Sequence, residues 1–318
     1  MSVFIKIRRL VMKKFLTSML FLALAGSVVL SSCTDKNDEK KKNEENQVVD
    51  EVTEEIPQVA VPEEQLDFEF EINTFNMEAK ITGYVGEKAN VVVPDTITDP
   101  VYGDVVPVTK IGTYAFAENE TIVAVKLPET VTDIEKGAFQ SCPQLRAVAL
   151  PVGLTTIGEY AFYNSNKIEK LGAVIENEFT EEKDLFEVIG NEFPSTVESI
   201  GFMAFSSQLN EIAWYKALTD DVVVIGDGIL LKFNANKNYT MDESIKSVAY
   251  YAFSNVGPVK ITVTNPELEL DDNAVFMSNK ALTFVVPADA KDLASDVRLC
   301  GAAYEFAQAI EETQDAEA

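Results

Sequence analysis

Few side chains in this sequence could carry out catalysis or bind a metal. The chain contains no histidine, which excludes Ser-His-Asp and Cys-His catalysis and every metal site that uses histidine. Its three cysteines, Cys33, Cys142 and Cys300, lack the spacing of a zinc or redox motif. Adjacent carboxylates at Asp220–Asp221 and Asp271–Asp272 are the nearest approach to a glycosidase-like pair. On an acidic chain, however, neighbouring carboxylates at turns are more typical of a solvated surface.

One asparagine cluster has a spacing that is similar to a calcium loop. Asn234, Asn236 and Asn238 alternate with other residues, but the carboxylates and the closing glutamate of such a loop are missing. The sequence therefore predicts no catalytic residue, no metal ligand and no cofactor site, and we expect a protein that is not an enzyme.

The first residues, 1–32, are predicted to form an export signal. Two lysines precede the uncharged apolar run Phe15–Leu30, whose 16 residues are fewer than a membrane-spanning helix needs. The Leu-Ser-Ser-Cys sequence that ends at Cys33 resembles a bacterial lipobox, so Cys33 is the predicted lipidation site. An uncleaved anchor helix and plain secretion are the alternatives. Met12 is a better start than Met1, because the lysines and the apolar run follow it directly.

A charged segment separates this signal from the rest of the chain. Residues 34–66 hold 11 acidic and four basic side chains, so 33–66 is predicted to be a lipidated cysteine followed by a disordered tether. Asp35, Asp38 and Glu39 resemble a surface-export signal of some Gram-negative anaerobes. We therefore expect an outer membrane lipoprotein that is exposed at the cell surface, with the periplasmic orientation as the alternative.

The net charge limits the classes of partner. A formal charge of −26 makes nucleic acid a poor partner, because the phosphate backbone is also negative. Repulsion from anionic lipid likewise favours contact with the membrane through the lipid anchor only.

One short sequence that ends in phenylalanine, first seen at Val108–Phe116, is repeated along the remainder of the chain, and we call it the phrase. Three of the five steps between its closing phenylalanines are 23 residues, and the other two, 43 and 48, equal 23 plus insertions of 20 and 25. Self-similarity at this period indicates a solenoid, in which stacked units bury a shared apolar column. The copies are Val108–Phe116, Val131–Phe139, Leu154–Phe162, Val197–Phe205, Ile245–Phe253 and the degenerate Leu268–Phe276.

Between the phrases lies a second signature, a short apolar strand that ends at a proline. It is clearest at Ile122–Pro128 and Leu145–Pro151, where the proline ends the strand because it has no N–H to donate. Glycines follow the buried isoleucine of several phrases, at Gly112, Gly158 and Gly201. We interpret these glycines as tight backbone turns.

The combined pattern L-x-x-V-x-L-P-x-x-V-x-x-I-G-x-x-A-F-x-x-C/N resembles the BspA-type leucine-rich repeat of bacterial surface proteins, over roughly residues 68–287. The resemblance implies a right-handed β-rich solenoid with a parallel sheet on one face and short helical or irregular segments opposite. It also implies a hydrogen-bonding ladder three residues after each phenylalanine. That position holds Asn119, Cys142, Ser165 and Asn279, but Gln208 and Val256 in two distorted units.

The rest of the chain is predicted to form caps and insertions around this solenoid. A Gly-Asp-Gly turn between apolar runs predicts a hairpin at Val222–Phe233, and an acidic excursion is expected around 176–193. In the last unit, Asp271 occupies the buried isoleucine position, which predicts a slip to Leu270. Leu293, Val297, Ala303, Phe306 and Ile310 follow helical spacing. The predicted parts are a β-rich entry cap at 67–107, a solenoid at 108–287 with insertions near 175–194 and 216–241, and a helical exit cap with an acidic tail at 288–318.

The two cysteines of the mature domain are expected to lie far apart. Cys142 falls in the ladder and Cys300 in the exit cap. If each repeat unit forms one rung of the stack, they lie at least four rungs apart, or roughly 19 Å at the usual strand spacing. A disulfide needs Cα atoms within about 7 Å. We therefore predict no disulfide between them.

The resemblance implies a cell-surface protein that recognises or adheres to a protein partner, such as a host extracellular-matrix protein or another cell-surface protein. A structural or assembly subunit of an envelope complex is the alternative, and a glycan-binding or glycan-degrading accessory protein is favoured less. Tyr114, Tyr160 and Tyr251 share one repeat position, where either a sugar platform or edge packing would explain them. The outward candidates Lys126, Arg146, Glu169 and Lys170 form no stripe, so the ligand-binding residues stay unassigned.

Overall fold

The computed structural model of the chain describes residues 59–172, 174–176, 186–188, 192–205, 212–253, 256–270 and 282–308. The chain divides into two compact units, Met1–Glu55 and Ile56–Ala318, and all described residues belong to the second. The predicted export signal and Cys33 therefore lie outside the described residues. Within the described part, none of the helices combines the length and the apolar character that crossing a membrane requires.

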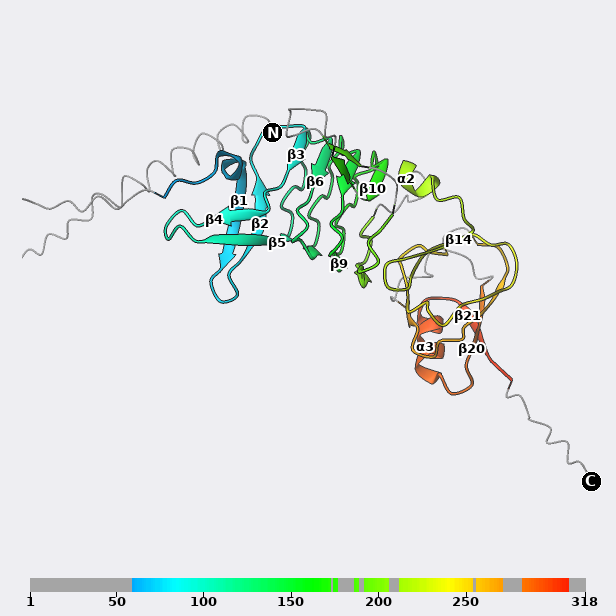
Figure 1. Cartoon of the computed structure of the whole chain (residues 1–318). Coiled ribbons are helices and arrows are strands. Elements are labelled where there is room, and N and C mark those ends of the chain that lie inside the picture. The colour runs from blue at the N-terminus through cyan, green and yellow to red at the C-terminus, as the bar shows by residue number, and fades with distance from the viewer. Residues whose placement is uncertain are drawn as a thin grey trace, which may run out of the picture. The chain divides into compact units, whose positions relative to one another are not determined.

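The repeat unit builds two rows of short parallel strands, one on each side of the core (Figure 1). The resemblance implied short helical or irregular segments opposite the main sheet, whereas the phrase itself forms a second row, in which every strand after β5 has two residues. The first row comprises β3 (Asn90–Val92), β6 (Ala124–Lys126), β8 (Ala147–Ala149) and β10 (Lys170–Gly172). The second comprises β5 (Val105–Ile111), β7 (Asp133–Ile134), β9 (Thr156–Ile157) and β13 (Ser199–Ile200).

The closing phenylalanines that the structure describes form the interior of the stack, as the sequence predicted, and Phe276 lies outside the described residues. The rings of Phe116 and Phe139 are 4.9 Å apart and nearly parallel, and Phe139 and Phe162 are 5.3 Å apart at 3°. Phe205 continues the column 5.8 Å beyond Phe162. Trp214, on the short helix α2 (Ala213–Lys216), is fully buried and packs against Phe205. A column of stacked rings thus replaces the separate core of a globular domain.

The predicted hydrogen-bonding ladder is present at two of the described positions, Cys142 and Ser165. Ser165 Oγ donates to the carbonyl of Phe139 at 2.6 Å and accepts from the N–H of Cys142 at 2.9 Å. The Cys142 thiol donates to the carbonyl of Phe116 at 3.1 Å. Asn119 instead accepts from the N–H of Ile122 within its own turn. Gln208 and Asn279 lie outside the described residues. The predicted absence of a disulfide is confirmed, because Cys142 and Cys300 are both buried and unbridged.

The buried ladder thiol should make the protein less stable at alkaline pH. Burial raises the pKa of the Cys142 thiol from its ordinary 9.0 to about 11, so above about pH 9 only the unfolded chain releases this proton. The stabilisation is complete below about pH 9 and should fall by roughly 2–3 kcal/mol as the pH rises to about 11. Urea unfolding across this range measures the loss. Cys142→Ser should remove this part of the slope; an identical slope in that variant would contradict the assignment.

The sequence suggested that the glycines after the buried isoleucines form tight turns, but the structure shows a different role for them. A Cβ on Gly158 would lie 2.7 Å from the backbone of Glu135, and one on Gly201 would lie 2.5 Å from the N of Glu159. These glycines are therefore required because adjacent rungs approach closely. Left-handed backbone occurs instead two residues before the phenylalanine, at Tyr114, Gly137, Tyr160, Met203 and Tyr251.

The predicted hairpin at 222–233 is confirmed, and its second strand also serves as a rung. β14 (Val222–Ile225) pairs antiparallel with β15 (Ile229–Phe233), and β15 pairs in parallel with β17 (Ser247–Val248). The turn joins the preceding rung, since the N–H of Asp227 donates to the carbonyl of Val197 at 2.7 Å. β17 in turn pairs with β19 (Glu269–Leu270), which places Leu270 opposite Val248 and confirms the predicted slip.

The entry cap is β-rich as expected, but it begins earlier than predicted. β1 (Phe68–Asn73) and β2 (Glu78–Tyr84) form a hairpin, and β4 (Thr96–Thr98) pairs with β5. The 3-10 helix η1 (Glu63–Asp67) falls inside the segment that was predicted to be a tether. The buried Gln65 amide explains the difference, because it donates to the carbonyl of Thr98 and accepts from its N–H, both at 2.8 Å.

The exit cap is only partly helical. α3 (Lys291–Leu299) is the expected helix, but Ala303 and Phe306 belong to a strand, so their helical assignment was wrong. Gly301, at φ 82°, ends the helix in the left-handed conformation. The chain then forms β21 (Ala303–Phe306), which extends a third parallel row. That row comprises β16 (Tyr239–Thr240), β18 (Lys260–Thr262), β20 (Thr283–Val286) and β21. Ile310 lies outside the described residues.

Candidate binding surface

The outward side chains of the first row mainly connect neighbouring rungs. Arg146 and Glu169, which come just before β8 and β10, form an ion pair across one rung step. Lys126 lies on β6 and Lys170 on β10, and each has an interaction partner. Of the four candidates, Arg146 and Glu169 are thus brought together in one ion pair.

Part of this face is covered by the first insertion. The predicted acidic excursion contains a hairpin of β11 (Val174–Glu176) and β12 (Phe186–Val188), and β12 contacts both β8 and β10. Val188 and Ala149 are buried. The insertion thus covers part of β8 and β10, which the sequence could not indicate because the residues of the insertion are mostly polar.

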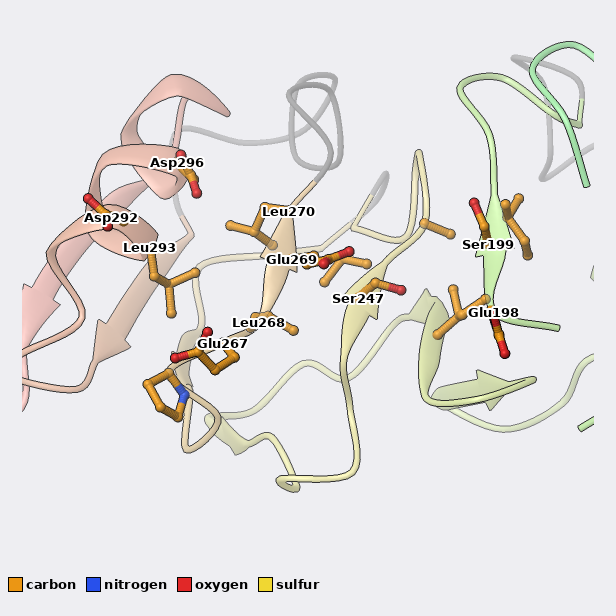
Figure 2. A pocket seen from close by; sticks show the side chains of 15 residues that line it. Glu198, Ser199, Ser247, Glu267, Leu268, Glu269, Leu270, Asp292, Leu293 and Asp296 are labelled. Carbon is orange, nitrogen blue, oxygen red and sulfur yellow. The ribbon is translucent and has the colours of Figure 1, made fainter. Parts of the chain in front are cut away.

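A hollow of about 560 Å³ lies where the second row of strands is interrupted. Figure 2 shows Glu198 and Ser199 of the β13 segment at one end, Ser247 of β17 in the middle, and Asp292 and Asp296 of α3 at the other end. Glu267 and Glu269 add two further carboxylates. No lysine or arginine is among the described residues that line it, so the hollow favours positively charged groups.

The candidate metal and catalytic residues of the sequence do not form a reactive site within the described part of the chain. Asn238 Oδ1 accepts from the N–H of Lys260 at 2.9 Å, which is a structural bond between two rungs. Asp221 uses its backbone carbonyl to accept from the N–H of Asn234. Asp271 and Asp272 lie outside the described residues. Among the described residues, no group of three His, Cys, Asp or Glu side chains has metal-binding geometry.

The left-handed turns form a second surface, which carries aromatic rings. Tyr160 contacts Phe202 at 5.6 Å, and Phe202 contacts Tyr250 at 4.6 Å. Tyr114 lies two rungs before Tyr160 and is 49% exposed. Tyr251, the third tyrosine of the predicted set, is buried. The sequence indicated the repeated tyrosines but missed Phe202 and Tyr250, which stand one residue before that repeat position.

The stacked parallel rungs, the phenylalanine column and the side-chain ladder define a leucine-rich-repeat solenoid. The chain belongs to the BspA type leucine-rich repeat family, whose model matches residues 109–206 and 174–297 in six copies. Leucine-rich repeat families are generally non-catalytic scaffolds, and their members typically bind proteins.

Several solved structures are similar to this chain. A leucine-rich repeat protein from Bacteroides capillosus is 26% identical, with 44% of this chain and 88% of that chain covered and a TM-score of 0.35. The T. pallidum leucine rich repeat protein is 21% identical over 76% of this chain and 97% of that chain, with a TM-score of 0.39. A leucine rich cell surface protein from Faecalibacterium prausnitzii is 14% identical over 76% and 93%, with a TM-score of 0.26. A comparison with curated proteins finds no match.

Proposed function

We propose that this chain is a non-catalytic recognition protein, anchored at the bacterial cell surface by a lipid on Cys33. The observation that carries the recognition role is the division of labour within each rung. The side chains of the polar ladder and the phenylalanines lie in the interior, as Cys142 and Phe139 do. The outward positions differ from rung to rung, so their residue types can vary to match a protein partner without disturbing the interior. The chemistry of the sequence supports the anchor, through the apolar run that ends at Cys33.

The anchor is tested by metabolic labelling with a fatty-acid analogue in the native bacterium. The chain should incorporate the label, Cys33→Ala should not, and Cys142→Ala should behave like the parent chain. Protease added to intact cells should remove the repeat domain if it faces outward. A labelled chain that the protease leaves intact would retain the anchor but overturn surface exposure.

The ligand class is tested by exposing cells that carry the anchored chain to immobilised matrix proteins, mucins and whole bacterial cells. Retention above that of a strain lacking the gene is the expected result. Crosslinking on the same cells separates the two roles of the fold. A single stoichiometric envelope partner, together with no retention, would replace recognition by an assembly role.

A further inference from the structure

One end of the aromatic turn surface has the features of a small binding site. Tyr114, Gly137 and Tyr160 occupy the same repeat position in three successive rungs, with φ of 58°, 62° and 56°. Because the backbone conformation is the same, these positions project from the stack in one line. Tyr114 and Tyr160 are two strand spacings apart, or roughly 9.5 Å.

The ring of Tyr114 occupies the space that a side chain at position 137 would fill, because residue 137 is glycine. A Cβ on Gly137 would lie 2.3 Å from Tyr114 Cε1 and 2.5 Å from Cδ1. The ring therefore rests on the backbone of the next rung, and it nevertheless remains 49% exposed. A ring covered on one side and exposed on the other is a flat apolar platform whose orientation is already fixed.

Polar groups lie beside the two tyrosines, on the rungs of Gly137 and Tyr160. Lys136 Nζ lies 2.6 Å from Glu159 Oε2 and 5.6 Å from the centroid of the Tyr160 ring. The hydrogen bond to Glu159, with the charge of that carboxylate, raises the pKa of Lys136. Gln140 Oε1 lies 3.1 Å from the Cβ position of Gly137, beside the Tyr114 ring. The Lys136 ammonium, paired with a carboxylate, thus lies over Tyr160, and the Gln140 amide lies beside the exposed Tyr114 ring.

We propose that Tyr114 and Gln140 form a subsite for one sugar ring of a neutral glycan, and that Tyr160 with the Lys136–Glu159 pair contacts the same chain further along. A pyranose presents apolar C–H groups that pack on an aromatic face and hydroxyls that both donate and accept hydrogen bonds. Lys136 supplies donors, the Glu159 carboxylate supplies acceptors, and the Gln140 amide supplies both. This inference goes beyond the proposed function, because it assigns a glycan ligand and does not depend on the anchor.

Two physical constraints narrow the class of glycan. The net charge of −26 disfavours uronic-acid and sulfated polymers. The tyrosines are separated by two strand spacings, which suits an extended β-1,4-linked chain in which every second ring turns the same face to the protein. The platform is shallow, so each contact is weak, and several copies on one cell would raise the avidity.

The test measures binding of the purified full chain, in a detergent without a sugar head group, to cellohexaose, xylohexaose and chitohexaose. Calorimetry or affinity electrophoresis provides the readout. We expect binding to at least one of the three, and Tyr114→Gly should weaken it at least roughly tenfold. Glycine suits the left-handed backbone at this position, so this variant removes the ring without straining the fold.

The matched control is Tyr102→Ala, which removes a 77% exposed tyrosine from the β4–β5 loop and should leave glycan binding unchanged. Tyr114→Phe should also retain binding, since it keeps the ring. Failure of all three oligosaccharides to bind, or equal binding by Tyr114→Gly and the parent chain, would overturn the glycan site. Retention of cells on matrix proteins is a separate measurement, so recognition of a protein partner could survive that outcome.

Discussion

Phe139→Ala is expected to lower the free energy of unfolding by about 4 kcal/mol. The ring is fully buried and stacks between Phe116 and Phe162 at 4.9 and 5.3 Å. Its removal leaves a cavity at the centre of the column, and the rungs on each side cannot close it because hydrogen bonds fix their spacing. Urea unfolding followed by circular dichroism measures the loss.

Two variants serve as controls for that measurement. Phe139→Leu keeps an apolar side chain and should cost less than the alanine variant. Phe75→Ala removes a ring that is 97% exposed at the β1–β2 turn and should change stability by less than about 0.5 kcal/mol. If Phe139→Ala cost no more than Phe75→Ala, the column could not be the core of the stack.

Gly226→Ala is expected to destabilise the contact between the turn of the 222–233 hairpin and the preceding rung by about 3 kcal/mol. The residue has φ 55°, and an added Cβ would lie 2.1 Å from the carbonyl of Val197. The left-handed backbone contributes about 1 kcal/mol of this cost, and relief of the overlap contributes the remainder. The displaced turn would also lose the bond from Asp227 to Val197.

Hydrogen exchange can locate this effect along the chain. Faster exchange is expected at the Asp227 amide and in β15, with little change in β6 to β9. Gly153→Ala is the matched control, because its Cβ would meet only the carbonyl of Glu129 at 3.7 Å. Uniform destabilisation, or an equal effect from Gly153→Ala, would show that Gly226 is not required for the contact between the hairpin turn and the preceding rung.

The repeat could be predicted because its phenylalanines and isoleucines have one role in every rung. Their spacing alone placed Phe116, Phe139 and Phe162 in the interior. The ladder at Cys142 and Ser165 followed from the family resemblance and is present at these positions. These features depend on local pattern and period, which a sequence carries directly.

Other features depend on contacts between distant segments, and the pattern could not show them. Gln65 resembles any polar tether residue until it meets Thr98, 33 positions away. The strand at Ala303–Phe306 has helical apolar spacing, but it pairs with β20 and becomes the last strand of its row. At the turn surface, the repeat position indicated Tyr114, but the sequence could not show that its ring lies over Gly137.

The bonds between rungs also determine how the domain should respond to a pulling load. Cys142, Lys136 and Lys167 each bond a partner 23 residues further along or back, one rung away. A force applied along the stack would load these bonds one rung at a time. The domain should therefore extend in small successive steps, each releasing 23 residues or roughly 80 Å of chain. Such a domain would lengthen gradually under load rather than unfold in one event.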